Sequence, residues 1–552
     1  MPFGGGVSSL LVRGRYLALL LLCAALYVPN LGGYLLFDVD EPRYAETARV
    51  MVETGEWVVP YFNGEYRFEK PVLTYWLIGA SYKLFGVGEF GARLPSALAA
   101  AGTVLLTCLA AGRLFSSGTG LAAGAILAVC LQFVGLGRMA LTDMHLAFFI
   151  TATLATFVIG IGHPERNRRR LWLLGTWFAS ALAVLTKGPV GLVLPGAVAL
   201  AYIALSGDII TKLRNVPWLT GFALFCLTTL PWYAAVTLRS DFEFFRTFII
   251  RHNLQRFAGE VAAGGQHVEP FYYYVPVVLL GVLPWTFFLA QAVIVPMRET
   301  AVSLVRSRRV SDPRLFPLLW ALGVIGFFSI ARAKLPTYVT PAYPALAILL
   351  AVYLAGLRER ARREGALGGS LWIPAALTFG LVAAIGGFLL FGPKDLAPFP
   401  LGGLPAWCAA ALVAGPLTAL ILLKKHRLHS ALGAAVTGQA AFSLVLALGV
   451  LPLVSEHRQK PQKQLVERAC DWLGNSGSLA AYRYRKTAIP FYARRTVAYY
   501  ELQDLQAGAL SGLGRPAAVI TRTRHLRELL EGTGGSLTAG VEGDLALVLL
   551  LR

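Results

Sequence analysis

The chain has 552 residues, of which 56% are hydrophobic and 14% are charged. Soluble domains rarely exceed about half apolar residues, so this composition predicts long membrane spans. The formal net charge is +20, but the basic residues stand in short clusters between apolar runs, a pattern typical of membrane topology and not of a nucleic-acid-binding face. Most of the 6 cysteines lie inside apolar runs, which excludes a disulfide framework and a CxxC metal site.

Long apolar runs divide the chain into membrane spans and loops. About 13 runs are long enough to cross a bilayer as helices. They cover approximately residues 16–34, 92–112, 118–137, 143–162, 171–187, 189–206, 217–238, 271–296, 315–331, 335–356, 371–391, 402–423 and 430–454. We keep the first run as a span because it lacks the small-residue exit of a cleavable signal peptide. The run 71–86 is short and carries Lys83, so it predicts a helix at the membrane interface.

Clusters of lysine and arginine predict the orientation of these spans. With the N-terminus in the cytoplasm, the clusters near residues 166–170, 212–214, 298–309, 358–363 and 424–427 all lie on the cytoplasmic side. If residues 71–86 crossed the membrane, every later loop would invert and the clusters would face outward. The alternation therefore favours about 13 spans, with the loop 35–91 and everything after about residue 455 outside.

The remaining unusual polar residues gather on the outer side. They are Asp40, Glu41, Arg43, Glu69, Lys70, Asp143, Lys187, Arg251, His252, Arg256, His267, Arg332 and Lys334. They are far apart in sequence but share one plane of the membrane, which predicts a site at the outer face. A carboxylate beside lipid headgroups is placed to accept a proton from an acceptor, or to balance charge that develops at a sugar carbon.

Two regions follow from this organisation. Residues 1–455 are predicted to form an all-α polytopic membrane domain, whose first outer loop, 35–91, carries a helix over 40–54 and a turn at Asn63-Gly64. Residues 456–552 are predicted to form a small soluble α/β domain outside the membrane. In it, "RYRKTAIPFYARRTVAYYE", "AAVITR" and "DLALVLLLR" predict short strands, while "KQLVERACDWLG" and "RTRHLRELLEG" predict helices.

Several candidates on the outer side also have a plain structural explanation. Asp40 and Glu41 suit the start of a helix, where acids cap the first turn and complement the dipole. Lys187 and Lys334 end apolar spans, so they either bind an anion or only snorkel to the interface. Asp143, in "LTDMH", is either the cap of a span or a residue of the site.

The segments "FEKP" and "RHNLQRF" carry the other candidates. Glu69 and Lys70 are adjacent, so they do not face the same way in a regular helix. Lys70 either contacts a lipid phosphate or snorkels, and Glu69 either meets a cation or is paired in solvent. His252 and Arg256 stand four residues apart, on one helix face. Glu69 and His252, from different loops, are also a candidate pair of ligands for a divalent metal, although they do not form an HExxH motif.

A family resemblance covers most of the chain from Phe37 to Leu354. It rests on "DEPRYAE", "NGEYRFEKPVLTYWL", "EFGARLPSAL", "LTKGPVGLVLPG", "RHNLQRF", "LPWT" and "KLPTYVTPAYPAL", in this order. The chain resembles the bacterial aminoarabinose transferase group of polyprenyl-phosphate glycosyltransferases, which are relatives of the protein O-mannosyltransferases. The segment after about residue 455 matches less clearly.

This resemblance implies a GT-C architecture in the bacterial inner membrane, with its active site on the periplasmic side. It implies an inverting transfer of a sugar from undecaprenyl phosphate to lipid A or another outer-face acceptor. By motif, Asp40 corresponds to the catalytic carboxylate, and Glu41 beside it is the second catalytic candidate. The donor phosphate would be contacted by Arg43, Lys70, Arg256 and Tyr338, with Lys187, Lys334 and Asp143 as further substrate-binding candidates. Glu69 and His252 correspond to a metal pair, for which His267 is the alternative second ligand.

Two other functions stay open at this point. A protein O-glycosyltransferase of the same fold would use a serine or threonine as acceptor, and its product distinguishes it. A lipid or solute transporter would place its functional charges near the bilayer midplane in broken helices. The candidates here lie at one face of the membrane, which favours the transferase. The expected partners are the lipid-linked donor, the acceptor and the bilayer, and no nucleic acid.

Overall fold

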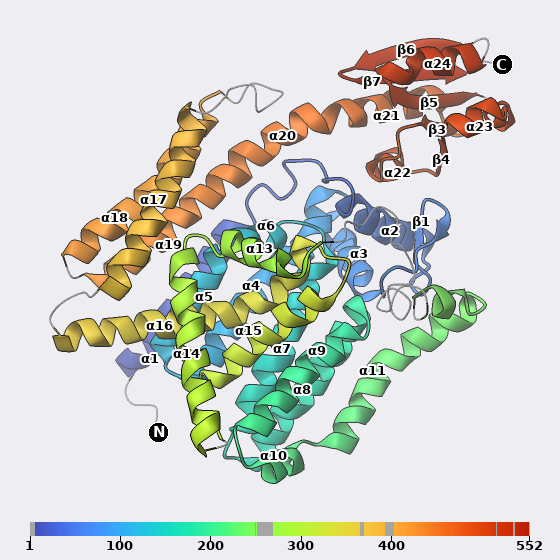
Figure 1. The fold of residues 1–552 in the computed structure, drawn as a ribbon. Coiled ribbons are helices and arrows are strands. Elements are labelled where there is room, and N and C mark those ends of the chain that lie inside the picture. Colours follow the sequence, from blue (N-terminus) through green and yellow to red (C-terminus); the bar gives the residue numbers. More distant parts are fainter. Residues whose placement is uncertain are drawn as a thin grey trace. The chain divides into compact units, whose positions relative to one another are not determined.

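The computed structural model describes residues 6–248, 250, 269–307, 309–364, 369–391, 402–425, 427–514, 516–533 and 536–550. The chain divides into two compact units (Figure 1). The first unit contains residues Met1–Pro29, Phe68–Thr74 and Arg93–Ala447. The second contains Asn30–Arg67, Tyr75–Ala92 and Leu448–Arg552, so segments from both ends of the chain build one unit. The domain boundary predicted at residues 455 and 456 stays a prediction.

The first unit is built from helices. They are α1 (Gly6–Tyr27), α4 (Glu89–Leu114), α5 (Ser117–Val129), α6 (Leu131–Gly137), α7 (Thr142–Ile161), α8 (Arg166–Lys187), α9 (Val190–Leu205), α10 (Ile209–Asn215), α11 (Trp218–Arg239), η2 (Phe271–Tyr273), α13 (Tyr274–Gly281), α14 (Thr286–Ser307), α15 (Leu315–Ile330), η3 (Pro336–Ala342), α16 (Tyr343–Glu364), α17 (Gly369–Phe391), α18 (Leu404–Lys424) and α19 (Leu428–Val445). Within the described residues, each predicted apolar run contains helix.

The helices of this unit have the lengths and composition of membrane spans. Eight described helices are long and apolar enough to cross a membrane, or nine if the bent pair α5–α6 is one span. Four shorter apolar helices are also present, among them α9 and α15. The protein is therefore a multi-pass membrane protein, and the fold is the predicted all-α body with a small C-terminal sheet.

Two of the predicted continuous runs are interrupted. The run 118–137 bends by 70° between α5 and α6. The run 271–296 is divided between α13, which ends at Gly281, and α14, which begins at Thr286. Pro284 lies in the second break, and proline has no N–H to donate to a helical hydrogen bond. Hydropathy alone averages over such breaks, because it measures composition and not the direction of the backbone.

The part of the first outer loop that belongs to the second unit has the predicted local structure. Helix α2 (Glu41–Thr54) has Asp40 at its N-cap and a proline in its first turn. It ends at Gly55, whose left-handed φ of 75° lets its N–H bond to the carbonyl of Met51. Strands β1 (Tyr61–Phe62) and β2 (Glu65–Tyr66) then form a hairpin. Its two turn residues have positive φ, as an Asn-Gly turn requires.

The rest of the second unit consists of short helices and a five-stranded sheet. The elements are α3 (Leu73–Phe85), α20 (Leu451–Arg458), α21 (Lys460–Leu473), β3 (Ser478–Tyr482), α22 (Ala488–Ala493), β4 (Val497–Tyr500), α23 (Leu502–Gln506), β5 (Ala517–Arg522), α24 (Thr523–Thr533), β6 (Ser536–Glu542) and β7 (Leu545–Leu550). The strand order is β4-β3-β5-β7-β6. Strand β3 is parallel to β4 and β5, and β7 is antiparallel to β5 and β6. Helix α3 confirms the helix predicted at 71–86, while its place at the membrane interface stays a prediction.

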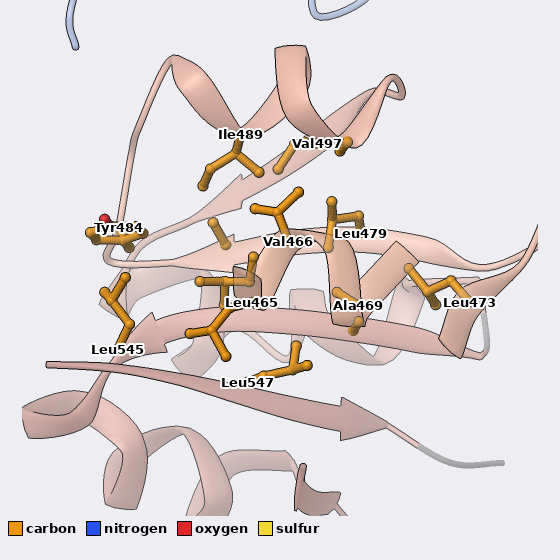
Figure 2. Packing of buried hydrophobic residues seen from close by; sticks show 14 of the residues in the cluster. Leu465, Val466, Ala469, Leu473, Leu479, Tyr484, Ile489, Val497, Leu545 and Leu547 are labelled. Carbon is orange, nitrogen blue, oxygen red and sulfur yellow. The ribbon is translucent and has the colours of Figure 1, made fainter. Parts of the chain in front are cut away.

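The sheet is buried on both faces. Figure 2 shows Leu465 and Val466 of α21 pointing toward the sheet residues Leu479, Leu545 and Leu547. On the opposite face, side chains of the alternate strand positions form a second core with α24. The apolar stripe of α21 recurs at helical spacing, and this pattern made the helix predictable from sequence.

The predictions for this sheet were right in part. Strands β4, β5 and β7 and helices α21 and α24 confirm the expected elements. The prediction of strands throughout "RYRKTAIPFYARRTVAYYE" is wrong at Ala488–Ala493, which form helix α22. Strands β3 and β6 have no counterpart among the predicted elements. Strand β3 is rich in alanine, a strong helix former, and only its pairing between two other strands makes it extended.

Candidate active site

The predicted catalytic acid stands at the start of helix α2. Asp40 is exposed, and its side chain makes no N-cap hydrogen bond. Glu41, the next residue, is fully buried and accepts the backbone N–H of Phe37 at 2.8 Å. Arg43, one turn into the helix, is half-buried. The two adjacent acids therefore differ: the carboxylate of Asp40 is open to a ligand, and that of Glu41 supports the backbone.

Helix α2 is anchored by charged residues of its own unit. The guanidinium of Arg49 donates two hydrogen bonds to Glu46, at 2.6 and 2.8 Å, and both side chains are buried. Arg67 lies 5.3 Å from the ring centroid of Tyr44 and donates to the Tyr75 hydroxyl at 2.9 Å. The Glu46 carboxylate of "DEPRYAE" is therefore paired within the helix, while Asp40 stays exposed at its start.

Another acid of this loop, Asp38, is held by residues from the C-terminal part of the chain. The hydroxyl of Thr487 donates to its carboxylate, and Lys486 lies 3.4 Å from the other carboxylate oxygen. Burial, and after it the charge of Asp38, raises the pKa of Tyr484 and Tyr499. Both phenols therefore stay protonated at neutral pH, and that of Tyr499 donates to the backbone carbonyl of Lys486 at 2.7 Å.

In the first unit, the structure brings together three predicted substrate-binding residues. Asp143 lies in the first turn of α7, Lys187 is the last residue of α8, and Tyr338 lies in η3. The Lys187 ammonium is 2.5 Å from the Asp143 carboxylate and 4.0 Å from the ring centroid of Tyr338. Their side chains are 10% and 12% exposed for Lys187 and Asp143. We call these three residues the Asp143–Lys187–Tyr338 cluster.

The cluster follows from the packing of consecutive helices. Helices α7 and α8 lie side by side in opposite directions, so that the start of one meets the end of the other (Figure 1). An acid at a helix start and a lysine at a helix end both complement the helix dipoles. The Thr142 hydroxyl also donates to the carbonyl of Thr186 at 3.1 Å, which ties the two helix ends together. Gly188, at a φ of 86°, then turns the chain into α9.

The structure also describes three other predicted residues, Lys334, Glu69 and Lys70. Lys334 is buried, and its ammonium donates to the backbone carbonyl of Glu269 at 2.8 Å. Glu69 and Lys70 are half-buried. The residue before them, Phe68, packs edge-on against Phe244 with 5.4 Å between ring centroids. The segment "FEKP" is therefore fixed to the first unit through its aromatic residue.

The metal prediction depends on residues that lie outside the described part of the chain. His252 and His267 lie there, and so does Arg256, the predicted phosphate contact. Among the residues that the structure describes, no group of three or more histidine, cysteine, aspartate or glutamate side chains could hold a metal ion. Both histidines predicted to join Glu69 lie outside the described ranges, and we derive no step that runs through a metal.

Sequence reasoning missed the residues that hold the loop before α2. Asp38 precedes "DEPRYAE", and Lys486 and Thr487 belong to a segment that was expected to be a strand. A threonine in a basic loop has no local pattern that points to a partner 449 residues away. The only signal was the position of Asp38, next to the predicted catalytic residue.

Known proteins resemble this chain over different shares of its length. A family model described as dolichyl-phosphate-mannose-protein mannosyltransferase matches residues 14–240. A protein of Aquifex aeolicus is 30% identical over 88% of this chain and 87% of its own. An undecaprenyl phosphate-alpha-4-amino-4-deoxy-L-arabinose arabinosyl transferase of Pectobacterium carotovorum is 32% identical, over 82% of this chain and 78% of its own. The transferase of that name from Shewanella sediminis is 34% identical over 59% of this chain, which spans only 57% of that relative's length.

Solved structures share the fold. The crystal structure of ArnT from Cupriavidus metallidurans bound to undecaprenyl phosphate has a TM-score of 0.79 at 24% identity and covers 97% of this chain and 98% of that chain. The oligosaccharyltransferase of Archaeoglobus fulgidus has a TM-score of 0.56 at 14% identity and covers 93% of this chain and 70% of that chain. The chain therefore has the fold of GT-C enzymes, with a many-helix body and a small C-terminal sheet.

Proposed function

Because the chain belongs to the family of undecaprenyl phosphate-aminoarabinose arabinosyl transferases, we propose that it is an inverting glycosyltransferase. It moves an aminoarabinose-like sugar, or another pentose or hexose, from undecaprenyl phosphate to lipid A or another outer-face acceptor. The observation that carries this proposal is the exposed side chain of Asp40, at the start of α2 in the segment "DEPRYAE". An acid that is neither buried nor engaged as a helix cap is available to a substrate.

During the transfer, the charge changes on two atoms: the acceptor oxygen that attacks and the phosphate oxygen that leaves. An acceptor oxygen attacks the anomeric carbon while the bond from that carbon to the phosphate oxygen breaks, and undecaprenyl phosphate leaves as an anion. Asp40 takes the acceptor's proton, or orients an acceptor that is already a phosphate anion. We propose that Glu41 acts as a positioning residue, because its carboxylate is buried on the Phe37 amide.

Cations stabilise the charge that grows on the leaving phosphate. We assign this role to Arg43, Lys70 and Arg256, together with the Tyr338 hydroxyl. In the Asp143–Lys187–Tyr338 cluster, the ammonium of Lys187 has three donors, and the contact with Asp143 uses one of them. Asp143 therefore orients Lys187 and leaves it able to donate to a phosphate. Lys334 is a weaker candidate, since it already donates to a backbone carbonyl.

A divalent ion held by Glu69 and His252, or by Glu69 and His267, is part of the proposal. A carboxylate and an imidazole are ligands that such an ion accepts, and the ion would add positive charge near the leaving phosphate. Treatment of the purified protein with EDTA tests this assignment. Loss of transfer that Mg²⁺ or Mn²⁺ restores supports it, and unchanged turnover contradicts it.

We further propose that the protein lies in the bacterial inner membrane with its active site on the periplasmic side. The alternation of basic clusters supports this orientation. Residues 1–455 then form the transferase domain, with the loop 35–91 outside, and residues 456–552 form a periplasmic domain. Reporter fusions after Gly55 and after Gln459 should both report an outside location. A cytoplasmic report from either fusion contradicts the orientation.

The function itself is tested by the product. The purified protein is reconstituted in proteoliposomes with undecaprenyl phosphate-α-4-amino-4-deoxy-L-arabinose and lipid A, and the lipids are analysed by mass spectrometry. We expect lipid A that is heavier by one sugar, with a changed anomeric configuration. Absence of this product from folded protein contradicts the proposed donor and acceptor pair.

A second candidate function is protein O-glycosylation. It is favoured by one observation, the match of residues 14–240 to the mannosyltransferase family model. A protein acceptor would offer a serine or threonine hydroxyl, which needs a base more than a phosphate does. Mass spectrometry of membrane proteins from cells with and without the gene distinguishes the two candidates, because only this second function adds sugar to peptides.

A further inference from the structure

The segment before Asp40 is irregular and forms no strand within the described residues. Its backbone groups are satisfied by side chains instead, and most of these belong to the C-terminal part of the chain. The contacts are Leu35 N to Ser455 Oγ at 2.8 Å, Leu36 N to Tyr492 OH at 3.0 Å, Phe37 N to Glu41 Oε2 at 2.8 Å, and Thr487 Oγ1 to Val39 O at 2.7 Å. The position of this segment therefore depends on side chains that are distant in sequence.

Asp38 is the most strongly held residue of the segment. The Thr487 hydroxyl points at both its carboxylate and the Val39 carbonyl, and Lys486 faces the second carboxylate oxygen at 3.4 Å. The side chain of Asp38 is 14% exposed. Hydrogen bonds and ion pairs to a charged group are stronger than neutral ones, especially when they are shielded from water.

The anchor itself is rigid. Thr487 precedes helix α22, whose Ile489 is fully buried in the core of the five-stranded sheet. The backbone carbonyl of Lys486 accepts the hydroxyl of Tyr499, which belongs to strand β4. The residues that hold Asp38 are thus tied to a sheet, and movement of the anchor would require movement of a packed core.

Asp40 differs from Asp38, because its side chain makes no hydrogen bond or ion pair within the described part of the chain. Its place is set by its neighbours, namely the held pair Asp38–Val39 on one side and the buried Glu41 on the other. We propose that Thr487 and Lys486 are positioning residues for the reaction, which act on Asp40 through Asp38. This inference rests on the proposed function, in which Asp40 meets the acceptor.

A threonine-to-valine change tests the inference. Thr487→Val keeps the shape of the side chain and removes its hydroxyl, so the loop before α2 loses its contacts to Asp38 and Val39. A displaced catalytic group lowers turnover, and we expect kcat to fall by about 10- to 100-fold with little change in KM for the donor. Thr487→Ser keeps the hydroxyl and should restore kcat to within about threefold of the unchanged protein.

The matched control is Thr521→Val, in the same sheet. Thr521 is also buried, and its hydroxyl donates to the backbone carbonyl of Tyr482 at 3.0 Å, away from the loop before α2. The control should lower thermal stability about as much as Thr487→Val and leave kcat near normal. Transfer is measured in proteoliposomes with undecaprenyl phosphate-α-4-amino-4-deoxy-L-arabinose and lipid A, after the thermal unfolding of each variant has been recorded.

A double variant decides whether Thr487 acts through Asp40. If it does, Thr487→Val combined with Asp40→Asn is no slower than Asp40→Asn alone, because a positioning residue has nothing left to position. Normal kcat in Thr487→Val, equal losses in Thr487→Val and Thr521→Val, or multiplied losses in the double variant would each overturn the inference. Normal turnover in Asp40→Asn would instead overturn the proposed function.

Discussion

Asp143 in the first unit and Asp38 in the second are both nearly buried acids with a lysine partner, but their partners come from different distances. Lys187 lies 44 residues after Asp143, at the end of the next helix. Thr487 lies 449 residues after Asp38, beyond every membrane span. The first contact follows from two consecutive helices that pack in opposite directions. The second exists only because the two ends of the chain build one unit.

The Asp143–Lys187–Tyr338 cluster and the loop before α2 are therefore held in place by different kinds of contact. The Asp143–Lys187–Tyr338 cluster is fixed by helix ends, so its geometry is as rigid as the helices themselves. The loop before α2 is irregular and takes its order from distant side chains. Contacts that are made one at a time by side chains are easier to remove by a single substitution than the hydrogen bonds of a helix. The predictions below use this contrast, from the largest expected effect to the smallest.

The largest effect is expected at the exposed end of the loop. Asp40→Asn keeps the size of the side chain and removes its charge and basicity, so turnover should fall by about 10²- to 10⁴-fold. Turnover is measured in proteoliposomes with folded protein. Asp38→Asn is the matched control: it keeps an acceptor for Thr487, weakens the pairing with Lys486, and should lower turnover much less. Near-normal turnover in Asp40→Asn would mean that Asp40 has only a structural role at the start of α2.

A large loss of stability is expected in the first unit when its ion pair is broken. Lys187→Met leaves the Asp143 carboxylate without its cation in a place where little water reaches it. Removal of one partner of such a pair costs about 3–5 kcal/mol, and thermal unfolding in detergent should shift to lower temperature. The double variant Lys187→Met with Asp143→Asn should recover most of this loss. If the single variant unfolds at the normal temperature, the pair is not important for the first unit.

Smaller effects are expected at the cations assigned to the donor phosphate. Lys70→Ala and Arg256→Ala each remove a charge-assisted contact, which should lower kcat/KM for the donor by about 1.5–3 kcal/mol in transition-state free energy. Lys83→Ala is the control, because its ammonium lies over the ring of Trp57, 4.4 Å from the centroid, and has no assigned role. Unchanged kcat/KM in both test variants would rule out the phosphate role.

The smallest effect is expected where the first outer loop meets the sheet. The side-chain amide of Asn63 donates to the carbonyl of Val497 at 2.9 Å and accepts its N–H at 2.7 Å, at the edge strand β4. Asn63→Gly removes both bonds and tolerates the φ of 53° at this turn. We expect a loss of about 1–2 kcal/mol, seen as faster hydrogen exchange at the Val497 amide.

Gly64→Ala serves as the counterpart to that change. It keeps both hydrogen bonds of Asn63 but places a Cβ at a φ of 82°, a backbone conformation that glycine adopts without steric strain and alanine does not. Exchange at Val497 that is equally fast in both variants would mean that the turn geometry matters and the two side-chain bonds do not.

Local patterns predicted a large part of the fold. The apolar runs, the helix from Asp40 to Thr54 with its stop at Gly55, and the Asn63-Gly64 turn are all found in the structure. Each of these depends on residues within one or two turns of one another. The prediction missed the breaks in two apolar runs and the helix α22, because apolar content and β propensity do not report where a backbone changes direction.

In the candidate site, too, the sequence predicts some features and the structure adds others. The sequence predicts that Asp143 and Lys187 share one side of the membrane, and the resemblance adds Tyr338. The structure shows that Lys187 contacts both Asp143 and Tyr338. The sequence also marks Asp40 and Glu41 as a pair, whereas the structure separates them into an exposed acid and a buried one. The direction of a side chain at a helix start depends on the packing around it, and adjacent residues have no reason to share it.

By itself, the sequence determined the membrane character of the chain and the family to which its motifs belong, while the orientation under the positive-inside rule stays a prediction. These properties depend on composition and on short patterns, which act wherever they occur in the chain. Only the tertiary structure decided that Thr487 and Lys486 hold Asp38 and that Asn63 bonds to Val497. A hydroxyl or an amide bonds to any suitable partner within about 3 Å, and which partner comes that close is decided when the sheet and the first outer loop fold into one unit.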